Sequence, residues 1–240
     1  MHLLGRNLLG RPVSLVRTAI QIVNDRVGNM KNLVVLVLCV VSIIVLAGCT
    51  APLEIDAMES TESTESSEPT PIPSKISFTA PTLERAEDLG SQHDLRNSFD
   101  GPILMLWVAS GCSGCHDWTD LIRSEMNAGN ISNTTTIISV HRYPEFETSE
   151  DVNRRYGDNS SEHYAPWPVL VPDASTTVID RETGRMTDVG LFTAFGEPVT
   201  PTLQVIDSEG GIAWTSSKYW ATTTVLEEAL NIMAQQEGIQ

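Results

Sequence analysis

Apolar residues gather in two regions of the 240-residue chain, a leader and a folded segment. The leader run, residues 33–48, contains no charged residue over sixteen positions. It is short for a membrane span, which needs ~20 residues, and long enough for the apolar core of a signal peptide. The second region, residues 76–237, carries shorter apolar runs at strand and helix spacing, and we expect it to fold as one domain.

The first half of this domain predicts a β-α-β unit. Residues 103–108 are continuously apolar between turn signals, which is typical of a strand covered on both faces. Residues 135–140 are rich in β-branched side chains and predict a second buried strand. Between them, four apolar side chains fall on one face of a helix: Trp118, Leu121, Ile122 and Met126. This order predicts a parallel strand pair with a right-handed crossover.

The second half predicts a β-β-α unit. Residues 202–206 and 212–217 flank a turn sequence and predict a hairpin. A last helix is expected to start at Thr224, with Glu227 as its partner in a capping box. Its apolar stripe consists of Val225, Leu226, Ala229, Leu230 and Met233. With a variable segment between the two units, the predicted fold class is α/β with a mixed central sheet.

The end of the leader resembles a bacterial lipoprotein signal. Lys31 precedes the apolar run, and Leu46-Ala47-Gly48-Cys49 closes it. The resemblance implies that residues 1–48 are a signal segment and that Cys49 carries a lipid, which anchors the domain at the extracytoplasmic face of a bacterial cell membrane. The alternative is an uncleaved anchor helix. Because the leader's arginines lie far upstream of the apolar run, we expect translation to start at Met30.

Charge is concentrated after this signal. Residues 49–75 are rich in Glu, Ser, Thr and Pro without an aromatic residue, so they predict an acidic tether rather than a packed segment. The net charge of the whole chain is −16. Residues 1–48 contain five basic residues and one acidic residue, so the net charge of the remaining chain is −20. An acidic chain without a basic stripe excludes nucleic acid as the partner.

Two cysteines of the domain carry the candidate chemistry. The other two of the chain's four cysteines lie before the domain, at positions 39 and 49, whereas Cys112 and Cys115 stand where the first buried strand ends and a helix begins. The N–H groups and the dipole of a helix N-terminus stabilise an anion, so the pKa of Cys112 is expected to be lowered. Cys115 can then attack a mixed disulfide formed at Cys112 and release the partner.

These residues give the segment from about 78 to 233 a resemblance to the thioredoxin fold, specifically to membrane-tethered disulfide reductases of the TlpA type. The resemblance rests on the strand before Cys112-x-x-Cys115 and on Val199-Thr200-Pro201-Thr202 before a later strand. It implies a cis peptide bond at Pro201 and a substrate contact through Thr200. It also implies thiol–disulfide exchange with exported protein substrates, as a reductant without a cofactor. An outward location permits electron supply by a membrane donor.

The sequence departs from that family at several positions. Leu106 stands where thioredoxin has a buried acid, and Trp118 stands where some tethered members carry a functional glutamate. Ser113-Gly114 replaces a pair that often contains proline, and Gly111 replaces a common tryptophan. No group that would deprotonate Cys115 is therefore evident, and the neighbouring His116 and Asp117 are the candidates.

Two other classes of site stay open. Cys112-x-x-Cys115-His116 is also a c-type haem attachment motif, with Met186 as a weak distal ligand. Alternatively, the two thiols could hold copper or zinc together with one imidazole, that of His116, His141 or His163. Our first hypothesis includes no metal.

Two further features receive structural interpretations. An acidic cluster near an expected helix start predicts a solvated face, and it comprises Glu145, Glu147, Glu150 and Asp151. Trp167, between two prolines, is expected to pack a rigid loop against the core.

Overall fold

The computed structural model describes residues 70–95 and 97–238. The predicted signal segment, the predicted start at Met30, the predicted lipidation site Cys49 and most of the predicted tether lie outside these residues. Thr70 and Lys75, from the end of the expected tether, contact the domain: Thr70 donates a hydrogen bond to Asp188, and Lys75 pairs with Glu209. No helix in the described part of the chain is both long and apolar enough to cross a membrane.

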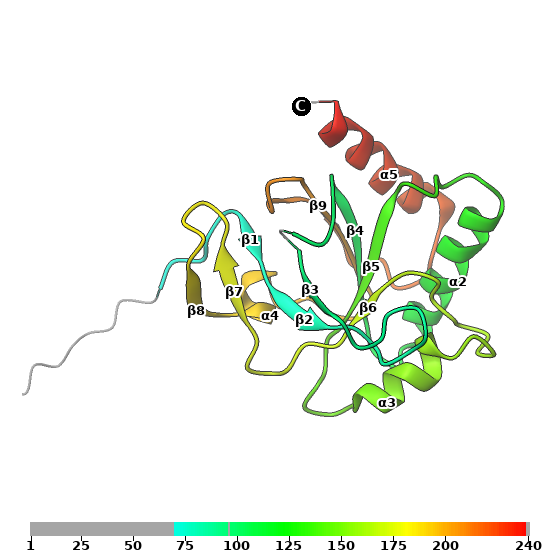
Figure 1. Ribbon diagram of the computed structural model, residues 1–240. Helices are drawn as coiled ribbons and strands as arrows, with labels where there is room; N and C mark the ends of the chain where they lie inside the picture. The colour runs from blue at the N-terminus through cyan, green and yellow to red at the C-terminus, as the bar shows by residue number, and fades with distance from the viewer. Residues whose placement is uncertain (1–69, 96, 239–240) are drawn as a thin grey trace, which may run out of the picture. The chain divides into compact units, whose positions relative to one another are not determined.

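A mixed five-stranded sheet forms the centre of the domain, in the order β10-β9-β4-β5-β6 (Figure 1). Its strands are β4 (Ile103–Val108), β5 (Thr136–His141), β6 (Val169–Leu170), β9 (Thr202–Ile206) and β10 (Ile212–Ser216). β4 pairs in parallel with β5 and antiparallel with β9, and β9 pairs antiparallel with β10. The predicted β-α-β unit, the hairpin and the mixed sheet are confirmed.

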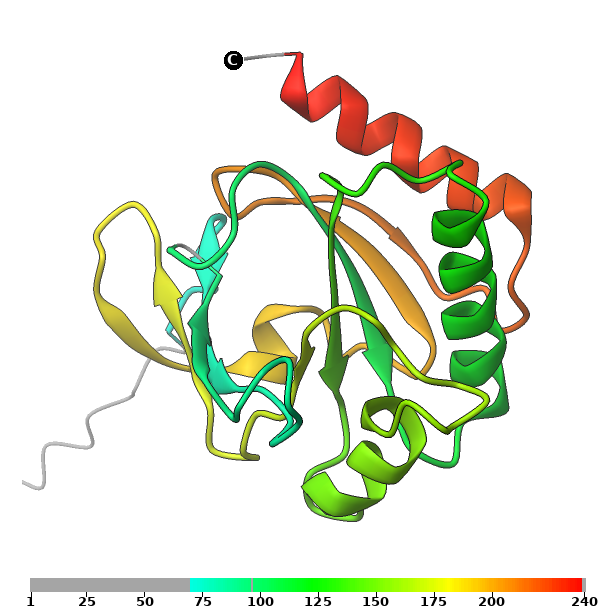
Figure 2. The same ribbon diagram turned by 45° about the vertical axis from the view of Figure 1, so that its right-hand side comes forward.

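Two long helices cover one face of this sheet, α2 (Ser113–Asn127) and α5 (Thr223–Glu237), as Figure 2 shows. The apolar side chains of β4 alternate between the two faces, which explains why the strand is continuously apolar. Leu104, Leu106 and Val108 join the core beneath the helices. Met105 and Trp107 join a second core on the opposite face, with Phe192 and Phe195.

The segment before β4 and the variable segment between the two predicted units together build much of that opposite layer. A separate three-stranded sheet has the order β1-β7-β8, and a two-stranded sheet pairs β2 with β3. The bounds are β1 (Ile76–Ser77), β2 (Thr79–Pro81), β3 (Gln92–Asp94), β7 (Thr177–Asp180), β8 (Met186–Gly190) and the short helix α4 (Leu191–Ala194). The polar stretch 180–188 is the turn of the β7–β8 hairpin with its flanking residues.

The last helix, α5, begins at Thr223 and is capped by Thr222, whereas Thr224 was predicted for both the start and the cap. The predicted start is therefore wrong by one residue, and the predicted cap is wrong by two. Thr222, with an extended backbone, caps α5 and accepts a hydrogen bond from the N–H of Val225. Each residue of the Thr222-Thr223-Thr224 run has a hydroxyl that could cap a helix, so local sequence does not distinguish them. The predicted apolar stripe is confirmed, since Leu226, Ala229 and Met233 are buried.

Candidate active site

Cys112 and Cys115 form a disulfide at the junction of β4 and α2, with their Cα atoms 5.2 Å apart. Cys112 is the N-cap residue of α2, and its Sγ accepts the N–H of Cys115 at 3.1 Å. Cys112 keeps 9% of its surface exposed, whereas Cys115 has none. Cys112 is therefore the more exposed residue of the pair, and its sulfur accepts a helix N–H, whereas Cys115 is completely buried.

Pro201 packs against the residues between the two cysteines. The Thr200–Pro201 peptide bond is cis, as the family resemblance implied. A β-carbon added to Gly114 would lie 2.4 Å from the carbonyl oxygen of Tyr219 and 3.1 Å from Cδ of Pro201. Glycine at position 114 therefore lets the segments around Pro201 and Tyr219 approach the disulfide closely, which gives the departure at this position a physical reason.

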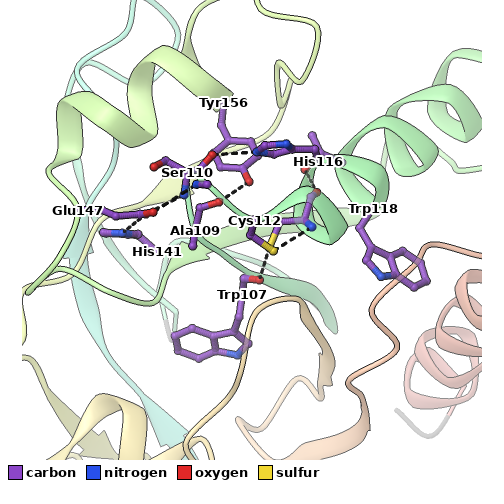
Figure 3. The surroundings of a disulfide bond; sticks show 12 residues. Trp107, Ala109, Ser110, Cys112, His116, Trp118, His141, Glu147 and Tyr156 are labelled. Atoms are coloured by element: carbon purple, nitrogen blue, oxygen red, sulfur yellow. Dashed lines mark hydrogen bonds and ion pairs between the residues drawn. A yellow bond between two sulfur atoms is a disulfide. The ribbon is translucent and has the colours of Figure 1, made fainter.

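Three side chains that lie outside the loop 109–111, which precedes Cys112, form hydrogen bonds to the backbone of that loop (Figure 3). The Tyr156 hydroxyl donates to the Ala109 carbonyl at 2.8 Å, and His116 Nε2 donates to the Ser110 carbonyl at 2.9 Å. Glu147 Oε2 accepts the Ser110 N–H at 2.7 Å, and Oε1 accepts the Gly111 N–H at 3.3 Å. We call these three side chains, Tyr156, His116 and Glu147, the loop clamp.

Tyr156 and His116 lie on different helices, whereas Glu147 lies in the segment that follows β5. Tyr156 lies in the π-helix η1 (Asn153–Gly157), which directly follows α3 (Ser149–Val152). π-Helical turns are rare and frequently occur at functional sites. His116 lies in the first turn of α2 and stacks on His163, with ring centroids 4.3 Å apart. His163 in turn bonds Asp120 at 2.8 Å.

The interpretation of the acidic cluster as a solvated face is wrong for Glu147. Its carboxylate is only partly exposed, and it also accepts from His141 Nε2 at 3.1 Å. Burial opposes ionisation of Glu147, but the N–H groups of Ser110 and Gly111 and the His141 imidazole outweigh it and hold its pKa below the usual range. Sequence reasoning missed this role, because Glu147 contacts a loop 36 residues earlier in the chain.

The two histidines of the site are held uncharged by burial. Burial lowers the pKa of His141, against the opposing effect of Glu147. It also lowers the pKa of His116, against the opposing hydrogen bond to Ser110. At neutral pH, both imidazoles therefore act as neutral hydrogen-bond donors, and the charge beside the loop is the carboxylate of Glu147.

Both candidates for deprotonating Cys115 form hydrogen bonds to other groups. His116 binds Ser110, and the Asp117 carboxylate accepts the N–H of Ala221 at 2.8 Å. Leu106, at the position of the thioredoxin acid, is completely buried. Cys115 Sγ lies 3.8 Å from the carbonyl oxygen of Trp107.

The remaining alternatives receive no support from this geometry. Attachment of haem needs both sulfurs at one exposed face, yet Cys115 has no exposed surface. His141 and His163 bind Glu147 and Asp120. Across residues 70–95 and 97–238, no group of three or more His, Cys, Asp or Glu side chains is arranged to hold a metal ion. As expected, Trp167 packs in the core, where its Nε1 donates to Ser139.

A pocket of about 620 Å³ lies beside the loop clamp. Glu147 and His141 line it together with Leu83, Asn153 and Asp173. The Glu147 and His141 side chains, which lie beside the loop 109–111, are therefore next to solvent-accessible space.

Topology and site together define the class of this protein. The β4-α2-β5 unit, the β9-β10-α5 unit and the Cys-x-x-Cys disulfide at the N-terminus of α2 are those of a thioredoxin fold with a dithiol/disulfide pair. The fold class predicted from the sequence is confirmed. No protein-family model and no curated protein matches the sequence.

Several solved structures are similar to the chain in fold. StoA from Bacillus subtilis is 16% identical, with a TM-score of 0.45 over 67% of this chain and 99% of that one. A thiol:disulfide interchange protein of the thioredoxin family from Chlorobium tepidum is 13% identical, with a TM-score of 0.46 over 69% and 99%. The pneumococcal exposed lipoprotein thioredoxin Etrx1 from Streptococcus pneumoniae is 18% identical, with a TM-score of 0.42 over 65% and 98%. At these identities the similarity concerns the fold alone.

Proposed function

We propose that the protein is a thiol–disulfide oxidoreductase of the TlpA type that exchanges disulfides with exported proteins, as a reductant. The observation that supports this most strongly is the position of Cys112. Cys112 is the more exposed residue of the pair, and its sulfur accepts a helix N–H, which stabilises a thiolate. Cys115 forms the disulfide with Cys112 and is completely buried, which supports its assignment as the resolving thiol.

The reaction proceeds in two exchange steps. In the reduced protein, the Cys112 thiolate attacks a substrate disulfide, so that one S–S bond forms, one breaks, and the departing substrate thiolate takes up a proton. Cys115 then loses its proton and attacks Cys112, which releases the second substrate thiol. Two electrons pass from the dithiol to the substrate, and the Cys112–Cys115 disulfide remains. Thr200 and Pro201 form the substrate platform in this proposal, and a membrane electron donor regenerates the dithiol.

The first prediction tests this activity and its direction. The reduced full-length protein, mixed with oxidised insulin, is expected to reduce one disulfide per chain and to be recovered with Cys112 joined to Cys115, as measured by thiol counting and mass spectrometry. The reduction potential of the Cys112–Cys115 pair, measured in glutathione buffers, should lie near that of thioredoxin, about −270 mV. It should not lie near that of strong oxidants, about −120 mV. Protein alkylated beforehand is the control. Unchanged thiol counts would contradict the activity, and a value near −120 mV would contradict the direction.

We further propose that Cys49 carries a lipid and that the acidic tether holds the domain at the extracytoplasmic face of the cell membrane. The support is the signal-like sequence that ends at Cys49 and the polar, acidic composition of the segment after it.

The second prediction tests the anchor. The full-length protein expressed in a bacterial host is expected to incorporate radiolabelled fatty acid and to fractionate with membranes. Cys49→Ser should lose the label, and Cys39→Ser, in the apolar run that precedes Cys49, is the matched control and should keep it. Label that persists in Cys49→Ser would contradict the proposal.

A further inference from the structure

The loop before Cys112 has its backbone fixed from three directions by the loop clamp. Tyr156 and His116 donate to carbonyl oxygens, whereas Glu147 accepts two N–H groups. Hydrogen bonds to an ionised carboxylate are roughly twice as strong as neutral ones. Glu147 is therefore the member of the loop clamp that binds the loop most strongly, and it is the one that carries a full charge at neutral pH.

That charge is bound to the backbone of the residue that directly precedes Cys112. Glu147 Oε1 is 3.3 Å from the backbone nitrogen of Gly111, the residue bonded directly to Cys112. Because the carboxylate is only partly exposed, solvent screens it less than it screens a surface charge. A negative charge there opposes formation of a second negative charge on Cys112.

We propose that Glu147 is a positioning residue for the disulfide, which fixes the Ser110–Gly111 backbone and limits the thiolate fraction of Cys112. The proposal rests on the exchange activity proposed above. The N-cap position alone favours the thiolate, and a stabilised thiolate makes a disulfide a stronger oxidant. Glu147 destabilises the thiolate instead, so it makes the Cys112–Cys115 pair a better reductant.

His141 makes this effect dependent on pH. The buried imidazole is uncharged at neutral pH, and the Glu147–His141 pair then carries one negative charge. Protonation of His141 in acid neutralises the pair and removes the repulsion from Cys112. The other titratable and charged groups around the pair and the loop include Glu84, Glu145, Glu150, Asp151, Asp173, Arg155, Tyr156, His116, His163 and Asp120.

The third prediction uses Glu147→Gln in the full-length protein. The amide keeps the size of the side chain and one acceptor but removes the charge. We expect the midpoint of the pH profile for alkylation of Cys112 to move to lower pH. We also expect the equilibrium constant with glutathione to shift about tenfold toward the dithiol, which corresponds to about 30 mV. Glu145→Gln, an exposed position in the same acidic segment, is the matched control and should leave both quantities unchanged.

His141→Gln gives an independent test that does not alter the carboxylate. It should retain the main midpoint of the alkylation profile and lose the inflection in acid that protonation of His141 produces in the wild type. The His141→Gln experiment tests the proposed role of Glu147 if the Glu147→Gln variant does not fold.

The outcomes separate this proposal from the activity on which it rests. If the wild type does not exchange disulfides, the proposed function fails. If the wild type exchanges and folded Glu147→Gln keeps its midpoint and equilibrium constant, the role of Glu147 is overturned. A slower Glu147→Gln with both quantities unchanged would show a structural role only and would also overturn the proposal.

Discussion

Replacing Cys112 with alanine is expected to lower the rate of disulfide exchange by on the order of 10³-fold or more, because the reaction then has no covalent route. The residual thiol of Cys115 has no exposed surface, so it cannot substitute for the missing nucleophile. The measurement is reduction of oxidised insulin by the full-length protein under the conditions used for the wild type.

The companion variant Cys115→Ala should behave differently. Its Cys112 still attacks substrate disulfides, but no second thiol resolves the mixed disulfide, so partners accumulate covalently bound to Cys112. Non-reducing electrophoresis and mass spectrometry of the adducts measure this trapping, with the double alanine variant as the control. Equal trapping by Cys112→Ala and Cys115→Ala would contradict the assignment of nucleophile and resolving thiol.

Local patterns in the sequence were sufficient to predict the central elements of the fold. The apolar run of β4 has the bounds predicted for it, because a strand buried on both faces leaves a continuous signal. The cysteine pair was also evident, since its position between a strand and a helix is itself a chemical argument. These features depend on neighbours in the sequence, and a single chain displays them directly.

The features that sequence analysis missed depend on contacts between distant segments. Nothing in the sequence distinguishes Glu147 from Glu145 or Glu150, since all are acidic residues in one polar segment. Only the path of the chain after β5 brings Glu147 to the N–H groups of Ser110 and Gly111. The β1-β7-β8 sheet was missed for a similar reason, because β1 pairs with a strand about a hundred residues later.

The loop clamp is itself supported by a second layer of long-range contacts. The Tyr156 carbonyl accepts the N–H of Ala165, and the Ala165 carbonyl accepts Nη1 of Arg85 at 2.6 Å. Arg85 also donates to the Trp167 carbonyl and pairs with Asp88. A buried guanidinium thus fixes the segment that leads, through Tyr156, to the loop of the disulfide.

Replacing Arg85 with methionine is therefore expected to lower the free energy of unfolding by about 3–5 kcal/mol. Methionine fills a similar volume, but it leaves the partly buried Asp88 carboxylate without its counter-charge. It also leaves the carbonyls of Ala165 and Trp167 without this donor. Urea unfolding of the full-length protein at neutral pH measures the loss, which is large against typical domain stabilities of about 5–15 kcal/mol.

Two further variants identify the buried charge as the cause. Arg154→Met removes an exposed arginine that pairs with Glu150 and Asp151, and it should cost less than about 1 kcal/mol. Arg85→Met combined with Asp88→Asn should recover part of the stability, because no uncompensated charge then remains buried. If Arg85→Met cost no more than Arg154→Met, the Arg85–Asp88 pair would not support the segment between Tyr156 and Trp167. The rigidity of the disulfide loop would then have to come from the loop clamp alone.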